Sequence, residues 1–103
     1  MWEVKGNDLS MVQGDYGVGL DIGLKGMTIN SSDSVKISIK QSGTAVVTKT
    51  FTNIQDSTIT LQLTSSDAEE LTPGLYLYDM DWYQDGVFQD TIIHNAEFRV
   101  VKK

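Results

Sequence analysis

The feature that most constrains this chain is a period-two alternation of apolar and polar residues, which recurs in short runs. In the clearest run, Val35, Ile37 and Ile39 alternate with lysine and serine. Successive side chains of a strand point to opposite faces of a sheet, so such a run predicts a strand with one buried face. No crossover helix is expected between the runs, which indicates an all-β chain with antiparallel pairing.

Turn signals separate these runs. Ser42-Gly43 joins a run at 35–40 to one at 45–52, and Asp85-Gly86 joins 75–83 to 87–93. Apolar alternation on both sides of a Gly-containing dipeptide predicts a β-hairpin in each case. Further strands are expected at 9–12, 18–24, 59–64 and 96–101.

One short helix interrupts the strands. Ser65 or Ser66 is the expected N-cap, and Glu69 is placed to complete a capping box with Ser66. Pro73-Gly74 limits the helix to a turn or two. We therefore expect helix over about 65–71 and strand elsewhere.

These elements predict a single domain over residues 1–103. Valine, isoleucine and threonine make up 27 of the 103 residues, as expected of β-branched strands. About seven strands with one short helix between the fifth and sixth favour an immunoglobulin-like antiparallel β-sandwich, with a small closed barrel as the alternative. Tyr76, early in the sixth strand, is then expected to send its hydroxyl back to the preceding connection as a tyrosine corner.

Charge and residue usage exclude several function classes. Fourteen acidic against eight basic residues give a net charge of −6, which argues against nucleic acid and anionic membranes as partners. Without cysteine there is no disulfide, zinc–thiolate or iron–sulfur site. His94 and Arg99 are the only histidine and arginine, which leaves little equipment for acid–base catalysis. We expect no enzyme and no cofactor.

A cation site is one interpretation of the acidic residues in the last hairpin. If Asp85-Gly86 is a two-residue loop, Asp81 lies opposite Asp90, and calcium would relieve the repulsion between them. A three-residue loop instead pairs Trp82 with Asp90 and leaves the carboxylates solvated. The second interpretation is favoured, so no metal is expected.

The aromatic residues of the same region allow two interpretations. Tyr78, Trp82, Tyr83 and Phe88 could form a platform for sugar rings, which would make the chain a carbohydrate-binding adhesion module. The period-two spacing of Tyr76, Tyr78, Met80 and Trp82 favours instead a core position for Tyr78 and Trp82.

An apolar surface is expected on the other face of this hairpin. Its candidate residues are Leu75, Leu77, Tyr83, Val87 and Phe88. Such a surface favours weak self-association, which salt should promote by screening the net negative charge.

Several segments resemble a known family. They are Val12-Gln13-Gly14-Asp15, the run 35–40, the stretch 71–79 with its Pro-Gly-x-Tyr-x-Tyr-Asp pattern, the Asp85-Gly86 turn and the closing run 96–100. Over residues 9 to 101 the chain resembles the small immunoglobulin-like domains of tailed-phage baseplate and tail proteins, most nearly the N-terminal domain of baseplate upper proteins.

The resemblance implies a non-enzymatic structural or assembly module of a phage or prophage. Its expected partners are other tail or baseplate proteins. Its expected location is the virion, after synthesis in the cytoplasm of the bacterial host. Nothing at the start of the chain resembles a signal peptide, and no apolar run has the roughly 20 residues of a membrane helix.

Overall fold

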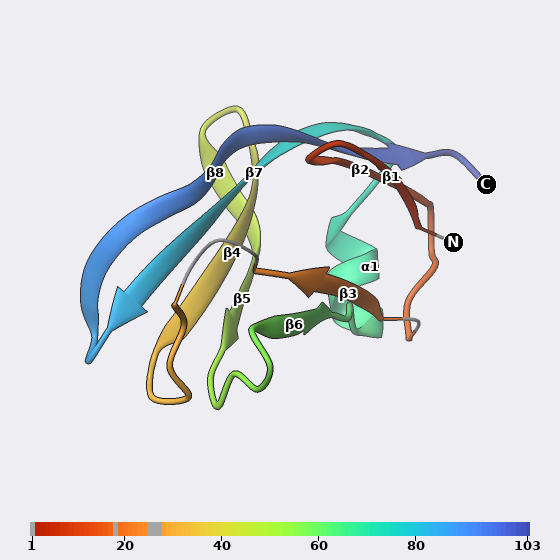
Figure 1. Ribbon diagram of the computed structural model, residues 1–103. Coiled ribbons are helices and arrows are strands. Elements are labelled where there is room, and N and C mark those ends of the chain that lie inside the picture. The colour runs from red at the N-terminus through yellow and green to blue at the C-terminus, as the bar shows by residue number, and fades with distance from the viewer. Residues whose placement is uncertain (1, 18, 25–27) are drawn as a thin grey trace.

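The computed structural model of the protein describes residues 2–17, 19–24 and 28–103. Within these residues the chain forms strands and one short helix (Figure 1). The elements in chain order are β1 (Glu3–Lys5), β2 (Asp8–Val12), β3 (Leu20–Gly23), β4 (Ser34–Gln41), β5 (Thr44–Phe51), β6 (Thr58–Leu61), α1 (Ser65–Glu70), β7 (Gly74–Gln84) and β8 (Val87–Val101). The predicted all-β class is confirmed.

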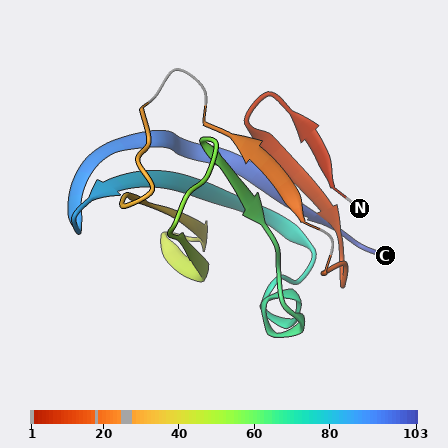
Figure 2. The same cartoon turned by 60° about the horizontal axis from the view of Figure 1, so that its bottom comes forward.

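The strands form two sheets that lie over one another like a sandwich. The larger sheet has six strands in the order β1-β2-β8-β7-β4-β5, and the smaller contains β3 and β6. In Figure 2 the long β7 and β8 arch over β3 and β6, which form a separate layer, and α1 lies at one end. Both chain ends lie on the same side of the molecule in the two views.

The core fills the space between the two sheets. Alternation along β4 buries Val35, Ile37 and Ile39, while the lysines and serine between them point outward. β7 contributes Tyr76 and Met80, and β8 contributes Phe98, which is 0% exposed. The ring of Phe98 meets those of Trp2 and Tyr78 edge-on, which adds aromatic contacts to the buried apolar area.

Both predicted hairpins are confirmed, since β4 pairs with β5 and β7 with β8, both antiparallel. The prediction of wholly antiparallel pairing is wrong at one place, because β2 runs parallel to β8, with Leu9 opposite Phe98. The runs expected at 87–93 and 96–101 form one continuous strand, β8. β1 was not predicted, and Val18 of the expected strand 18–24 lies outside the described residues.

The helix is confirmed, but its predicted cap is wrong. Thr64 is the N-cap, one residue before the expected serines, and Asp67 rather than Glu69 completes the capping box. The backbone N–H of Asp67 donates to Thr64 Oγ1 at 3.2 Å, and Asp67 Oδ2 accepts from the Thr64 N–H at 2.8 Å. The same carboxylate forms an ion pair with Lys49, which ties α1 to β5.

The predicted bond from Tyr76 is confirmed. Its ring is buried in the core, and its hydroxyl donates to the backbone carbonyl of Thr72 at 2.8 Å. The Thr72 hydroxyl lies 3.3 Å from the same oxygen. The bond fixes the connection between α1 and β7, because it joins the beginning of β7 to the segment just before it.

Candidate functional site

The outward face of β7 carries the apolar residues predicted for contact. Leu75 is 44% exposed and Leu77 is 38% exposed, whereas Tyr76 and Tyr78 between and beside them are buried. We call Leu75 and Leu77 the central leucine patch. An open depression lies beside it, lined by Lys40, Gln41, Ser42, Gly43, Leu75, Leu77 and Asn95.

A second apolar surface lies at the end of the hairpin. Asp85 and Gly86 form a two-residue turn with φ of 49° and 78°, the left-handed conformations that such a turn requires. Beyond it Val87 is 62% exposed and Phe88 52%, and the Phe88 ring meets that of half-buried Tyr83 edge-on at 5.8 Å. Val87 lies one rung nearer the turn, opposite Gln84, so it points to the other face of the hairpin from Tyr83 and Phe88. We call these three residues, which surround the end of the hairpin, the tip patch.

The structure does not bring the five predicted surface residues into one patch. Leu77 and Tyr83 are separated by six residue steps of extended strand, or roughly 20 Å. The central leucine patch and the tip patch are therefore two separate exposed apolar surfaces.

The pairing of β7 with β8 shifts register at three places. Each shift places an extra residue on β8, as in a β-bulge, and the local ladder is disrupted there. Gln89 and Ile92 are two of the extra residues, and His94 with Asn95 forms the third bulge opposite Asp79. β2 pairs with β8 only at residues 98–101, and the bulges bend the rest of β8, which makes its unpaired side a poor template for strand addition.

The bulge at Gln89 sets the positions of Asp81 and Asp90. The turn has two residues, so the three-residue loop of the favoured interpretation is wrong, but its pairing of Trp82 with Asp90 is confirmed, and Asp81 lies opposite Thr91. The Thr91 hydroxyl donates to Asp81 Oδ1 at 3.0 Å, and Asp90 Oδ1 accepts from the Thr91 N–H at 2.9 Å. Neighbouring rungs of a ladder face opposite sides, so the premise that the two carboxylates converge is wrong.

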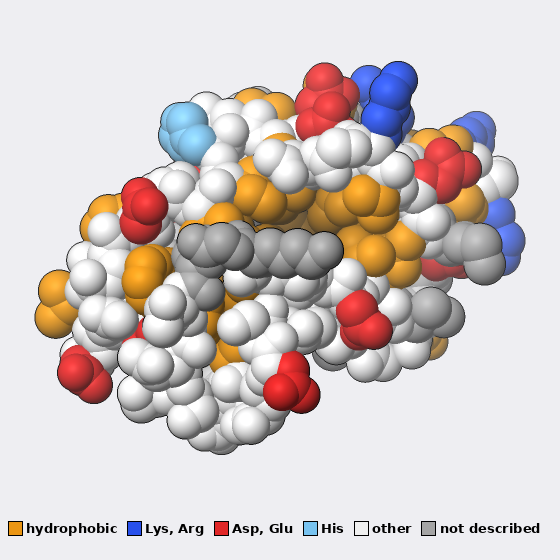
Figure 3. All heavy atoms as spheres, in the orientation of Figure 1, with side chains coloured by type: hydrophobic (Ala, Val, Ile, Leu, Met, Phe, Trp, Pro, Cys, Tyr) orange, Lys and Arg blue, Asp and Glu red, His pale blue; other side chains and the backbone are white. Residues whose placement is uncertain are grey.

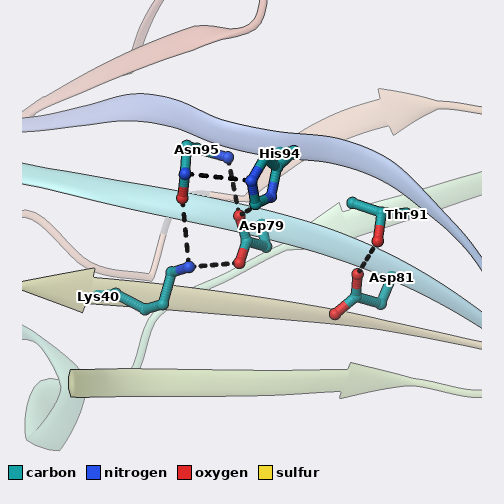
Figure 4. A network of polar contacts seen from close by, with 6 residues as sticks. All are labelled: Lys40, Asp79, Asp81, Thr91, His94 and Asn95. Carbon is teal, nitrogen blue, oxygen red and sulfur yellow. Dashed lines mark hydrogen bonds and ion pairs between the residues drawn. The ribbon is translucent and has the colours of Figure 1, made fainter. Parts of the chain in front are cut away.

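A polar network occupies the third bulge (Figure 4). Asp79 is at its centre: Oδ2 binds the Lys40 ammonium, and Oδ1 accepts the Asn95 backbone N–H at 2.8 Å. Lys40 also donates to Asn95 Oδ1 at 3.3 Å. Asn95 has a φ of 52°, a conformation that asparagine tolerates better than most residues. The network therefore holds the bulge and joins β4, β7 and β8.

His94 lies at the edge of this network. Its Nδ1 is 3.4 Å from Asp79 Oδ1, and its Nε2 is 3.2 Å from the Asn95 side-chain nitrogen. In a Ser-His-Asp site the second ring nitrogen faces a nucleophile. Here that nitrogen faces an amide, so the aspartate and the imidazole brace the bulge.

The aromatic residues do not line up as a platform. Tyr78 is buried, with its hydroxyl donating to the Asn7 carbonyl; burial and then the charge of Asp8 raise the pKa of Tyr78 to about 12. Trp82 is half-buried, and its Nε1 donates to Asp33 Oδ2 at 3.0 Å. Only Tyr83 and Phe88 of the four reach the surface together, and their rings are at 76° to one another.

Three carboxylates have a lowered pKa in the folded protein. The Asn30 backbone N–H lowers the pKa of Asp33 against the opposing effect of burial, with a further contribution from Trp82. Burial alone would raise the pKa of Asp67 and of Asp79, but hydrogen bonds from Lys49 and Lys40 and from backbone N–H groups outweigh it. In all three the folded state favours the ionised form.

Acid should therefore destabilise the protein. Because these folded-state pKa values lie below the unfolded value of about 3.9, the unfolded chain binds more protons near pH 3 to 4. The contribution is complete above about pH 5 and is lost as pH falls through the folded pKa values. Urea midpoints at pH 7, 5, 4 and 3 should fall mainly below pH 4, and less so in Asp79→Asn. A midpoint at pH 3 equal to that at pH 7 would contradict this.

Charge is unevenly spread over the face drawn in Figure 3. Lys and Arg side chains gather at the end where both termini lie, whereas Asp and Glu are distributed across the face.

No group of three or more His, Cys, Asp or Glu that could hold a metal ion occurs in the described part of the chain. Among the same residues, no helix is both long and apolar enough to cross a membrane.

Comparisons with protein-family models, curated proteins and solved structures found no match to the chain.

Sequence reasoning missed the network of Lys40, Asp79 and Asn95. One signal for it was present: Ile93 and Ala96 both point toward the core although they are three positions apart. A strand keeps a period of two, so a step of three between inward residues indicates one extra residue and hence a bulge.

Proposed function

We propose that the chain is an immunoglobulin-like domain. The strand order β8-β7-β4-β5 supports this proposal, since it matches the order G-F-C-C′ of that fold, as does the pairing of β3 with β6, which matches its B and E pair. The bond from Tyr76 to Thr72 has the place and direction of a tyrosine corner, at the start of the strand that follows the helix.

The proposed function is that of a non-enzymatic structural or assembly module, acting by protein–protein contact in a phage tail or baseplate. The tip patch carries this proposal. It holds two exposed apolar side chains at the end of a long hairpin whose strands are braced by β4 and by the bulge network. The phage setting is supported by the resemblance over residues 9 to 101.

The contacts of His94 also support a non-enzymatic role. The ring is exposed, and its two nitrogens lie near Asp79 and the Asn95 amide, neither of which is a nucleophile of the Ser-His-Asp kind. A rigid apolar tip is instead suited to insertion between the side chains of a partner, where aromatic residues contribute strongly to affinity.

Binding to purified tail and baseplate proteins encoded beside this chain tests the proposal. We expect one of them to co-elute with the protein in gel filtration, and the variant Val87→Ser/Phe88→Ser to lose at least tenfold in affinity by calorimetry. Val4→Ser, which removes another exposed valine, on β1, is the matched control and should bind normally. Binding of cell-wall polysaccharide with no binding to any tail protein would instead establish the adhesion alternative.

A further inference from the structure

The central leucine patch is surrounded by charges in a regular arrangement. In the register of β7 and β8, Arg99 lies opposite Leu75 and Glu97 lies opposite Leu77. All four side chains are on the outer face of the sheet, and Arg99 Nη2 is 3.6 Å from Glu97 Oε1. On the far side of Leu77, Lys40 is already bound by Asp79. The charges directly beside the two leucines on β8 are thus those of Glu97 and Arg99, which pair with each other within one copy and are bordered by Glu3, Lys5 and Asp8.

This arrangement is complementary to itself. Consider a two-fold axis that lies in the interface, perpendicular to β7, between the row formed by Leu75 and Arg99 and the row formed by Leu77 and Glu97. Rotation about this axis exchanges the two rows. Leu75 of one copy then faces Leu77 of the other, and Arg99 of one copy faces Glu97 of the other. In a two-fold interface the same surface of both copies meets, so each charge has to face an opposite charge of the other copy. Arg99 and Glu97 meet this requirement.

We propose that two copies of this chain pair face to face through the central leucine patch, with Glu97 and Arg99 forming reciprocal ion pairs across the two-fold axis. The inference deepens the proposed function, on which it rests, because it names a second copy as one partner of the module. It uses a surface separate from the tip patch, so a dimer leaves both tips free to contact other proteins.

The pairing is expected to be weak. The outer face is convex, because β7 and β8 arch over the second sheet, and convex surfaces meet over a small area (Figure 2). Interfaces below about 1,200 Å² in total are typical of transient contacts. The net charge of −6 on each copy adds long-range repulsion, which salt at about 0.15 M screens more strongly than it screens ion pairs in contact.

Charge reversal tests the pairing. Sedimentation from about 10 μM to 1 mM should show wild-type dimers only toward the upper end. Glu97→Arg and Arg99→Glu should each remain monomeric alone, because like charges then meet across the axis. An equimolar mixture of the two variants should form heterodimers, and the double reversal Glu97→Arg/Arg99→Glu should dimerise as the wild type does.

Three controls keep the result specific. Val4→Asp places a charge on an exposed valine of β1 and should leave dimerisation unchanged. Phe88→Ser tests the tip patch and should also dimerise normally, so the two proposals fail separately. If a reversed variant melts early, amide chemical shifts of the wild type during dilution provide the test, since they should change at residues 75, 77, 97 and 99.

Either of two results would overturn the pairing. One is a wild-type protein that stays monomeric to about 1 mM at moderate salt. The other is self-association of Glu97→Arg or Arg99→Glu at the wild-type level, which would show that copies meet through another surface.

Discussion

Replacing Phe98 with alanine is expected to cost about 3 to 5 kcal/mol of the free energy of unfolding, a large effect for one substitution. Phe98 is 0% exposed and lies at the point where β2, β8 and β7 meet, with Leu9 opposite it on one side and Tyr76 on the other. Its removal leaves a cavity that these neighbours cannot fill without moving strands. Urea unfolding followed by circular dichroism measures the loss.

Phe88→Ala is the matched control, because it removes the same ring from an exposed position of the same strand. Its cost should stay within about 0.5 kcal/mol. Domains of this size have only about 5 to 15 kcal/mol of stability in total, so Phe98→Ala should lower the melting temperature by more than ten degrees. Equal losses in the two variants would contradict the burial of Phe98 in the core.

Tyr76→Phe should cost about 1 to 3 kcal/mol although the ring itself is kept. The substitution deletes only the hydroxyl, which leaves the Thr72 carbonyl without the hydrogen bond that Tyr76 donates at 2.8 Å. The connection between α1 and β7 then loses its anchor. Amide hydrogen exchange of residues 71–75 should accelerate together with the fall in stability.

Two variants separate this bond from other effects. Tyr83→Phe removes a hydroxyl from a half-buried tyrosine of the same strand and should be nearly neutral. Thr72→Val keeps the backbone carbonyl but removes the threonine hydroxyl, which lies 3.3 Å from the Tyr76 hydroxyl, and should cost less than Tyr76→Phe. If Thr72→Val proves the more costly, the side-chain contact and not the carbonyl bond anchors the connection.

Much of the fold could be predicted because burial on one face leaves a direct record in the sequence. The alternation at Val35, Ile37 and Ile39 fixes both the strand and its inward face. The sequence contains no such record of which strand pairs with which, or in which direction. Nothing in the residues of β2 distinguishes parallel pairing with β8 from antiparallel pairing, because the inward positions of Leu9 and Met11 are the same in both.

The candidate site was harder to predict because it depends on register. The surface residues were found one by one from alternation, yet their division into two patches follows from distance along β7. Asp81 and Asp90 are an instructive case: the turn length was taken to decide whether they face one another, but a bulge at Gln89 moved Asp90 by one rung. One extra residue reverses the face of every later side chain in a strand, so small errors in register become large errors in a site.

The parallel ladder between β2 and β8 also affects how the chain reaches its fold. Leu9 and Phe98 are partners although almost the whole described chain lies between them. During synthesis at about 5 to 20 residues per second, the β1–β2 hairpin must wait several seconds before residues 98–101 exist. Throughout that interval Leu9 and Met11, both buried in the finished protein, have no ladder partner on β8. Contacts this distant in sequence slow folding. We therefore expect the local hairpins β4–β5 and β7–β8 to close early and β2 to join β8 last.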